Sequence, residues 1–265
     1  MFKYVLEPVG DNKYWYLCLW MCDTYAPILE KCFPSITFQF KPGISGTCDT
    51  TIALKENPVL ALQGILEIFK THLLLVKNEH VEPFFSNELV QCYALDFNLE
   101  SNIETDRFEY TKYGRLEHLA KEGQSEVARA ELIEAFANIC EKHPLYKRAD
   151  IVMPVPPNPL KTFHLPVLLT KELARKTGKK DGCSMIKKTK ETPRLQELPI
   201  DDKPEALKGA IKITGNVSGK DVIIVDDLYQ SGFTMWTVAK LLKQNGAKTV
   251  LGLACVKSLR DTDNQ

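Results

Sequence analysis

The pattern of hydrophobic and polar positions changes near residue 105. Before it, short apolar runs alternate with turn-forming residues, a pattern typical of strands. It predicts strands at residues 13–21, 35–40, 50–54 and 90–97. The apolar stretch 58–76 predicts a core helix, because polar residues interrupt it too often for a membrane span. The polar stretch 98–106 is a candidate linker.

After this candidate linker, predicted helices and strands alternate. Apolar residues at helical spacing predict helices at residues 125–143, 165–176 and 234–245. Continuous apolar runs predict strands at residues 150–156, 184–187, 222–225 and 249–256. Such alternation is typical of a parallel sheet covered by helices on both faces. We therefore expect an N-terminal α+β region, residues 1–105, followed by an α/β domain, residues 106–265.

Composition and charge narrow the class of protein. Of the 265 residues, 44% are hydrophobic and 26% are charged, which excludes disordered, collagen-like and coiled-coil chains. The net charge is zero, but residues 151–265 hold 19 basic and 12 acidic groups, whereas residues 1–150 hold 15 basic and 22 acidic groups. This asymmetry fits an anionic ligand on the C-terminal side, and a solvated basic surface explains it almost as well.

The eight cysteines follow no disulfide-framework spacing. Cys18 and Cys22 are spaced CxxxC and, with Cys32 and Cys48, form an irregular set, so buried or half-buried thiols are a better interpretation than a zinc site. The N-terminus has no apolar run of signal-peptide length. We expect an intracellular, cytoplasmic protein that does not bind a membrane.

The strongest chemical pattern is VIIVDDLYQSGFT, residues 222–234. Its β-branched residues predict a buried strand, and Asp226 and Asp227 follow where that strand ends, the place at which open α/β sheets bind ligands. The next loop leads into the N-terminus of a helix, whose free N–H groups and dipole favour an anion. Ser231 and Thr234 add hydroxyl donors, and Gly232 lets the backbone approach a phosphate closely. Two carboxylates, suited to hydroxyls or a divalent cation, thus precede a phosphate cradle.

This pattern resembles the signature of type I phosphoribosyltransferases. The resemblance implies that Asp226 and Asp227 are the catalytic pair and contact the ribose hydroxyls of phosphoribosyl pyrophosphate (PRPP). It also implies a magnesium cofactor that meets the pair through ribose or water. The 5-phosphate of PRPP would be held by Leu228, Tyr229, Gln230, Ser231, Gly232, Phe233 and Thr234. Gln230 departs from the family, which usually has a small hydroxyl residue or Ala there.

Flanking segments are similar to the ComF-like branch of this family, over about residues 108–258. The matching positions include a basic residue, Thr-Pro, an acidic-basic pair and Gly-Ala in residues 188–210, and the helix-opening residues Thr111, Gly114, Leu116, Leu119 and Lys121. By this resemblance, residues 188–210 are a mobile loop whose site residues are Lys188, Thr192 and Arg194. The pyrophosphate loop is Pro156, Pro157, Asn158 and Lys161.

Several other residues are weaker candidates. His164 lies near the expected pyrophosphate loop and could contact a ligand, and Lys187 could meet pyrophosphate or remain a solvated charge. Tyr229 could stack on a base or pack on the following helix. The ComF-like Arg-Gly-Phe-Asn-Gln run is replaced here by residues 161–165, which keep the aromatic residue and only one basic residue. No GxxxxGK[ST] or GxGxxG motif is present.

The resemblance implies displacement at C1 of PRPP with release of pyrophosphate. The expected ligands are PRPP or a ribonucleotide, and the hood that grips the second substrate would come from residues 1–105 or from a partner. The expected partners are a protein or further copies of the chain in a homo-oligomer. Two alternatives stay open. The missing basic residues around the pyrophosphate loop favour a non-catalytic PRPP or nucleotide sensor. The link of ComF-like proteins to competence favours a partner-dependent module in DNA uptake or anti-phage defence. No helix-turn-helix pattern supports nucleic-acid binding.

Overall fold

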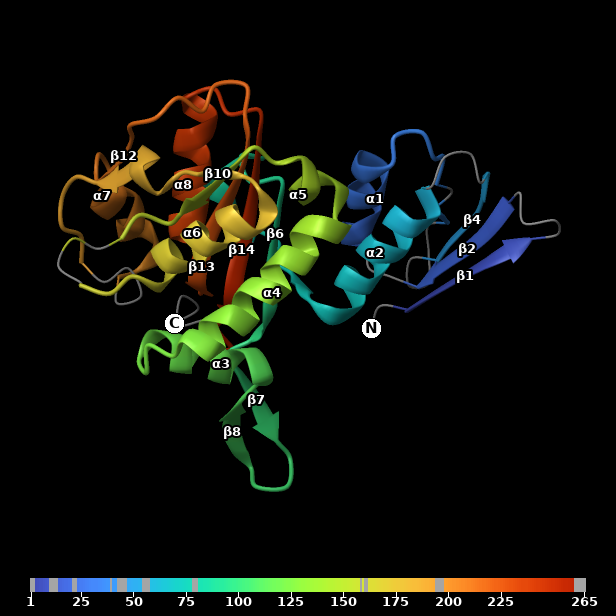
Figure 1. The fold of residues 1–265 in the computed structure, drawn as a ribbon, viewed down its shortest axis with the longest axis horizontal. Coiled ribbons are helices and arrows are strands. Elements are labelled where there is room, and N and C mark those ends of the chain that lie inside the picture. The colour runs from blue at the N-terminus through green and yellow to red at the C-terminus, as the bar shows by residue number, and fades with distance from the viewer. Residues whose placement is uncertain are drawn as a thin grey trace. The chain divides into compact units, whose positions relative to one another are not determined.

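The computed structural model of the chain divides into two compact units (Figure 1). Unit 1 is Met1–Thr71 with Cys140–Lys147, and unit 2 is His72–Ile139 with Arg148–Gln265. The residues that the structure describes are 3–9, 14–20, 23–38, 40–41, 47–53, 58–77, 81–157, 159, 162–193 and 198–259.

Unit 1 contains a four-stranded antiparallel sheet in the order β1-β2-β4-β3. Its strands are β1 (Lys3–Val9), β2 (Tyr14–Trp20), β3 (Phe40–Lys41) and β4 (Thr47–Ala53). The strands predicted near residues 13–21 and 50–54 are confirmed as β2 and β4. The strand predicted at residues 35–40 is wrong for residues 35–38, because the chain turns there and the Ile36 N–H donates to the Phe33 carbonyl at 2.9 Å.

The described helices of unit 1 include η1 (Asp23–Tyr25), α1 (Ala26–Cys32), α2 (Pro58–Thr71) and most of α5 (Pro144–Arg148). Helix α2 buries Leu62, Ile65, Leu66 and Phe69, and the rings of Tyr25 and Phe69 lie 4.5 Å apart. The Tyr4 hydroxyl donates to the Glu67 carboxylate and ties β1 to α2. Helix α2 ends at Thr71, earlier than predicted, because Leu73 and Leu74 form strand β5.

Unit 2 is built on a six-stranded sheet in the order β10-β9-β13-β14-β6-β5. The strands are β5 (Leu73–Leu74), β6 (Gln91–Phe97), β9 (Ile151–Pro154), β10 (Lys180–Asp181), β13 (Asp221–Tyr229) and β14 (Thr249–Lys257). All neighbouring strands are parallel except β5 and β6. The predicted α/β class with a helix-flanked parallel sheet is confirmed. Strand β6, which precedes residue 105, pairs with β14 in this sheet.

Helices cover both faces of this sheet. They are α3 (Lys112–Lys121), α4 (Glu126–Lys142), α6 (Leu165–Thr177) and α8 (Phe233–Gln244). Residues of α8, such as Met235 and Val238, pack against alternate residues of the central strands, such as Met153 and Ile224. The β13–α8–β14 and β9–α6–β10 crossovers run in opposite directions along the sheet, so the right-handed crossover rule places α8 and α6 on opposite faces.

Two small strand pairs complete unit 2. Strands β11 (Ile186–Lys188) and β12 (Ile211–Ile213) are antiparallel, with η5 (Ile200–Asp202) and α7 (Lys203–Leu207) between them. Strands β7 (Leu99–Asn102) and β8 (Arg107–Tyr110) form a hairpin that projects from the unit (Figure 1). The stretch 98–106 is therefore structured and not a plain linker. The Asn102 side chain caps its turn by accepting the Glu104 N–H at 3.0 Å. The described part of unit 2 also contains the short helices η2 (Glu82–Phe84) and η3 (Cys183–Met185).

Within the described part of the chain, no helix combines the length and apolar content that crossing a membrane requires.

Candidate active site

The acid pair lies inside strand β13 and not beyond its end. Strand β13 stays paired with β14 as far as Tyr229 and Lys257, but its last partner in β9 is Pro154, opposite Val225. Pro156 and Pro157 have no N–H to donate, so β9 cannot continue the ladder. Among the described residues, no strand pairs with this edge of β13 from Asp226 onward. This is where the ligand crevice of an open α/β sheet is expected.

The two carboxylates are held by the backbone beside them. The Asp227 N–H donates to the Asp226 carboxylate at 2.9 Å, and the Leu228 N–H donates to the Asp227 carboxylate at 2.8 Å. Burial raises the pKa of Asp226 well above its usual range, and the neighbouring charge of Asp227 acts in the same direction. The pair offers carboxyl oxygens to hydroxyl groups or to a cation, and a cation bound there would lower the pKa of Asp226 again.

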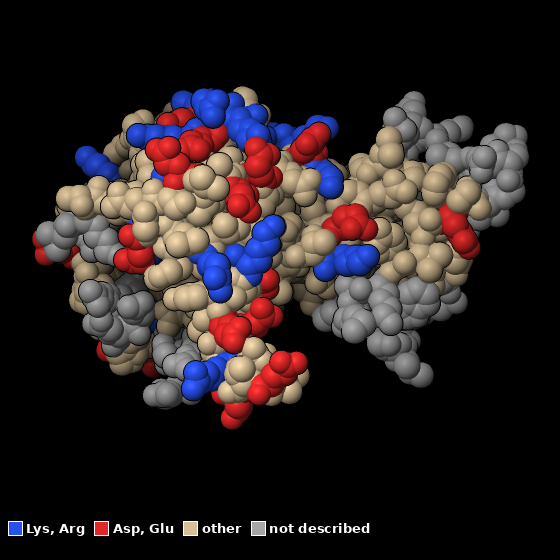
Figure 2. Space-filling model, turned by 60° about the horizontal axis from the view of Figure 1, so that its bottom comes forward, with Lys and Arg blue, Asp and Glu red and all other residues tan. Residues whose placement is uncertain are grey.

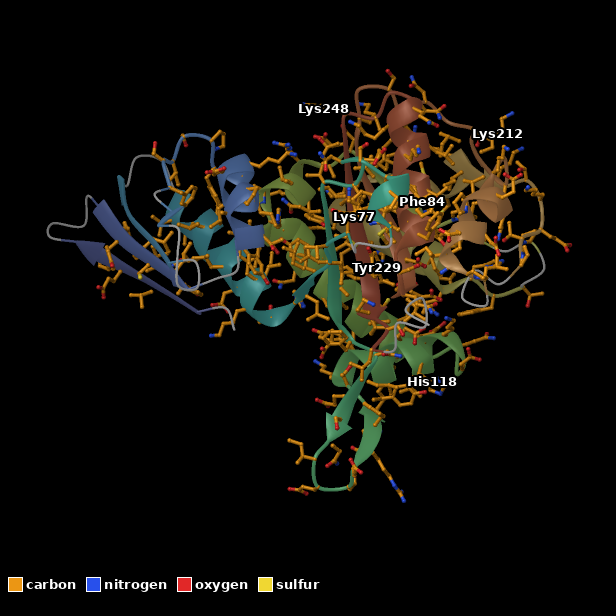
Figure 3. All side chains as sticks on the ribbon, turned by 180° about the vertical axis from the view of Figure 1, so that it is seen from behind. Lys77, Phe84, His118, Lys212, Tyr229 and Lys248 are labelled. Atoms are coloured by element: carbon orange, nitrogen blue, oxygen red, sulfur yellow. The ribbon has the colours of Figure 1, made fainter. Side chains whose placement is uncertain are left out.

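The conformation of the loop after β13 requires glycine at position 232. Gly232 has a φ of +80°, and a Cβ there would lie 2.1 Å from the Tyr229 hydroxyl, so only glycine fits. Tyr229 is buried, and its hydroxyl accepts the Trp236 indole N–H at 3.3 Å (Tyr229 is labelled in Figure 3). From the other side, the Lys257 ammonium donates to the Gln230 carbonyl at 2.8 Å. The side chain of Tyr229 thus supports the loop from within the core.

Helix α8 begins directly after this loop. Its N-cap, Gly232, has no side chain to cap the first turn, and the Trp236 N–H donates to the Gly232 carbonyl at 2.9 Å. The N–H groups that precede a first intrahelical bond have no acceptor within the helix, and the helix dipole adds positive potential there. Ser231 and Thr234 place hydroxyl groups at the same turn. This end of α8 has the properties of a phosphate cradle.

Helix α3 brings a cation to the acid pair. The Lys121 ammonium lies 2.8 Å from the Asp227 carboxylate and 3.4 Å from that of Glu117, one turn earlier in α3. Burial acts to lower the pKa of Lys121, but the two carboxylates together raise it above its usual value. Burial raises the pKa of Glu117 against the effect of Lys121. Sequence analysis assigned Lys121 only to a matching helix. Nothing in that assignment pointed to Asp227, which lies far from Lys121 in the sequence.

These elements surround a cavity of about 880 Å³. Most residues expected in the site line it: Pro156, Pro157, Lys188, Thr192, and Asp226 to Thr234. His164 lines it as well, whereas Lys187 does not. Asn158, Lys161 and Arg194 lie outside the described residues. The structure adds Lys121 and Lys203 to the lining, neither of which was predicted as a site residue.

The expected mobile loop contributes polar groups to this cavity. Burial lowers the pKa of Lys188. The Thr192 hydroxyl is buried and has no hydrogen-bond partner in the described part of the structure. Lys203, at the start of α7, is only 1% exposed. A cavity with buried hydroxyl and ammonium groups is suited to an anionic, oxygen-rich ligand.

Residues 167–261 match the family model of the phosphoribosyl transferase domain. The matched stretch contains β13, the loop and α8, and it excludes Lys121 and the expected pyrophosphate loop.

Two curated relatives are ribose-phosphate pyrophosphokinases. That of Mycoplasma pneumoniae is 32% identical over 111 residues, and that of Helicobacter hepaticus is 29% identical over 98 residues. These alignments cover 38% and 35% of this chain, and the chain spans about a third of the length of each relative (33% and 28%).

Two solved structures of low identity are also similar. A purine phosphoribosyltransferase from Pyrococcus horikoshii has a TM-score of 0.31 at 20% identity, covering 51% of this chain and 77% of that one. A hypoxanthine phosphoribosyltransferase from Staphylococcus aureus has a TM-score of 0.28 at 13% identity, covering 58% of this chain and 70% of that one.

Proposed function

We propose that the chain binds PRPP in the cavity of unit 2 and catalyses displacement at ribose C1 with release of pyrophosphate, as a ComF-like phosphoribosyltransferase. The observation that carries the proposal is the acid pair on the unpaired edge of β13, followed at once by the glycine-started helix α8. The family match over residues 167–261 supports the same assignment.

In this proposal, the residues act by position and charge. Asp226 and Asp227 accept hydrogen bonds from the ribose hydroxyls, and the first turn of α8 holds the 5-phosphate. Lys188 and Lys203 supply positive charge within the cavity that they line. Holding the sugar and both phosphate groups in one orientation lowers the barrier to displacement, and fixed donors stabilise the departing pyrophosphate.

Magnesium fits the same residues. Among the described residues, no cluster of three or more His, Cys, Asp or Glu side chains could hold a metal ion alone. The two carboxylates Asp226 and Asp227 suit an ion that takes its other ligands from water and substrate phosphates, as Mg²⁺ commonly does. When bound, the ion would neutralise charge on the leaving pyrophosphate. The role of residues 1–105 as a hood or partner-binding region stays a prediction.

Calorimetric titration of PRPP with magnesium tests the proposal. Wild type should bind, and the double variant Asp226→Asn/Asp227→Asn should not. Asp106→Asn is the matched control, because Asp106 is exposed in the β7–β8 hairpin turn, where its positive φ of 51° also suits asparagine. Pyrophosphate release on adding nucleobases would then identify the acceptor. Absence of binding by wild type contradicts the proposal.

A second candidate is a sensor that binds PRPP or a nucleotide without turnover. It is favoured by the described wall of the cavity near the pyrophosphate loop, which is formed by Pro156, Pro157, Thr162, Phe163 and His164 and holds no Lys or Arg among them. Binding without pyrophosphate release would support it. A role in DNA uptake or anti-phage defence has less support, because the sequence contains no helix-turn-helix pattern. On the one face drawn in Figure 2, basic and acidic side chains are interspersed. Salt-sensitive binding of nucleic acid would be its test.

A further inference from the structure

Lys121 stands beside the expected ribose site but outside the residues that match the family model. Its ammonium lies 2.8 Å from the Asp227 carboxylate and 3.4 Å from that of Glu117, and the Lys121 side chain is 29% exposed. An ammonium carries three N–H donors. Two are directed to these carboxylates, and in the described part of the chain no acceptor is found for the third. Lys121 also lines the cavity, so this donor is available to a ligand.

Helix α3 holds Lys121 in a fixed place. Its N-cap, Thr111, accepts the Gly114 N–H at 2.9 Å and donates to the Phe97 carbonyl, at the end of β6, at 2.6 Å. Gly114 lies so close to the chain after β6 that a Cβ there would be 1.9 Å from the Asn98 carbonyl oxygen. The helix is thus anchored to the sheet, and a cation at its last turn is positioned by a rigid element.

The chemistry of a ribose hydroxyl fits this arrangement. A hydroxyl donates one hydrogen bond and can accept two, whereas an ionised carboxylate only accepts. A hydroxyl that donates to Asp227 still has lone pairs to satisfy, and Lys121 is the donor next to that carboxylate. We propose that Lys121 recognises the ribose diol by donating a hydrogen bond to the hydroxyl that Asp227 binds, and that it thereby selects ribose over a deoxyribose. This inference rests on the proposed function of the cavity.

The test measures how Lys121 and each hydroxyl depend on one another. Affinities for ribose 5-phosphate, 2-deoxyribose 5-phosphate and 3-deoxyribose 5-phosphate are measured by competition against PRPP in calorimetry. The proteins are wild type, Lys121→Met, Lys121→Gln and Lys121→Arg. Lys112→Met is the control, because Lys112 is an exposed lysine of the same helix outside the cavity lining. Removing the lysine and removing a sugar hydroxyl, separately and together, gives the interaction free energy between these two groups.

A hydrogen bond to a charged group contributes roughly 1.5–3 kcal/mol, which corresponds to about tenfold or more in affinity. Wild type should therefore prefer ribose 5-phosphate to each deoxy sugar by about tenfold or more. In Lys121→Met and Lys121→Gln, the preference over one deoxy sugar should fall about tenfold, while Lys121→Arg keeps part of it and Lys112→Met keeps all of it.

Two results would overturn the inference alone. In the first, wild type shows no preference for ribose 5-phosphate over the deoxy sugars. In the second, Lys121→Met and Lys121→Gln lower the affinity for all three sugars by the same factor. In both, PRPP still binds, so the proposed function stands. Wild type that fails to bind PRPP overturns the proposed function as well. Circular dichroism and melting temperatures identify a variant that fails to fold. The folded Lys121→Arg variant then decides, because a ribose preference that falls while the affinity for the deoxy sugar stays unchanged requires a contact with the diol.

Discussion

Replacing Gly232 by Ala should destabilise unit 2 and abolish binding at the candidate phosphate cradle. Gly232 has a φ of +80°, a region in which a residue with a Cβ costs roughly 1–2 kcal/mol. The new Cβ would also lie 2.1 Å from the hydroxyl oxygen and 2.2 Å from Cζ of Tyr229, a buried ring that cannot move outward freely. Overpacking of this kind costs about 1–3 kcal/mol more.

Gly219→Ala separates these two effects. Gly219 has a similar φ of +71°, but no atom lies within 4 Å of the Cβ that Ala would add. It should therefore lose only the roughly 1–2 kcal/mol of the backbone effect and should leave ligand binding unchanged. The difference between the two variants measures the contact between the loop and Tyr229.

Hydrogen exchange of peptides from β13 and β14, followed by mass spectrometry, reports the stability of unit 2 by itself. Gly232→Ala should exchange faster than Gly219→Ala by a factor that corresponds to the extra 1–3 kcal/mol, or about 5- to 150-fold. Equal rates in the two variants would refute the reasoning, because Tyr229 would then not occupy the space beneath the loop. PRPP binding that survives in Gly232→Ala would refute the assignment of this turn as the phosphate cradle.

Three further predictions follow from the same contacts. Thr111→Ala removes the N-cap of α3 and should lower the free energy of unfolding, measured by thermal melting, by about 1 kcal/mol. Thr111→Ser should keep most of that stability, so equal melting temperatures of the two variants would contradict the prediction. Burial, followed by the hydrogen bond and charge of Glu67, raises the pKa of Tyr4 to about 12. The stabilisation that the neutral Tyr4 hydroxyl contributes is therefore complete below pH 10 and is lost as the pH rises to about 12. Tyr4→Phe should not show this loss. An ultraviolet titration in which Tyr4 ionises at pH 10 would contradict the prediction. Burial raises the pKa values of Cys92 and Cys255, so both thiols should resist alkylation in the native protein and react after denaturation, and fast native labelling would contradict their burial.

The acid pair, its loop and the following helix could be predicted because they are consecutive in sequence. The β-branched run before Asp226 favours a strand wherever it lies, and Gly232 marks the turn that leads into α8. The length of β13 could not be predicted in this way. The strand continues to Tyr229 because β14 still pairs with it, and whether a neighbouring strand is present depends on residues far away in the sequence.

The six-stranded sheet also combines features that the sequence predicts locally with pairings that it does not predict. The apolar pattern correctly predicted a strand at β6, but pairing between β6 and β14 places that strand in the large sheet, beside elements on the other side of the expected boundary at residue 105. The stretch 98–106 contains β7, which is half-buried at Leu99 and Asn102, and the exposed turn that leads to β8. Polar composition alone does not distinguish such a hairpin from a linker.

By itself, the sequence determined which residues form the strand–loop–helix turn and what chemistry that turn offers, since strand propensity, glycine and the helix start act over a few neighbouring residues. Only the tertiary structure decided which edge of β13 is left unpaired, that Tyr229 fills the space under Gly232, and that Lys121 lies against Asp227. The unpaired edge of β13 and the ion pair between Lys121 and Asp227 depend on β9 and α3, which are distant from β13 in sequence. Tyr229 and Gly232 are close in sequence, but the place of the Tyr229 ring is set by its packing in the core of unit 2. No periodicity or local propensity encodes them.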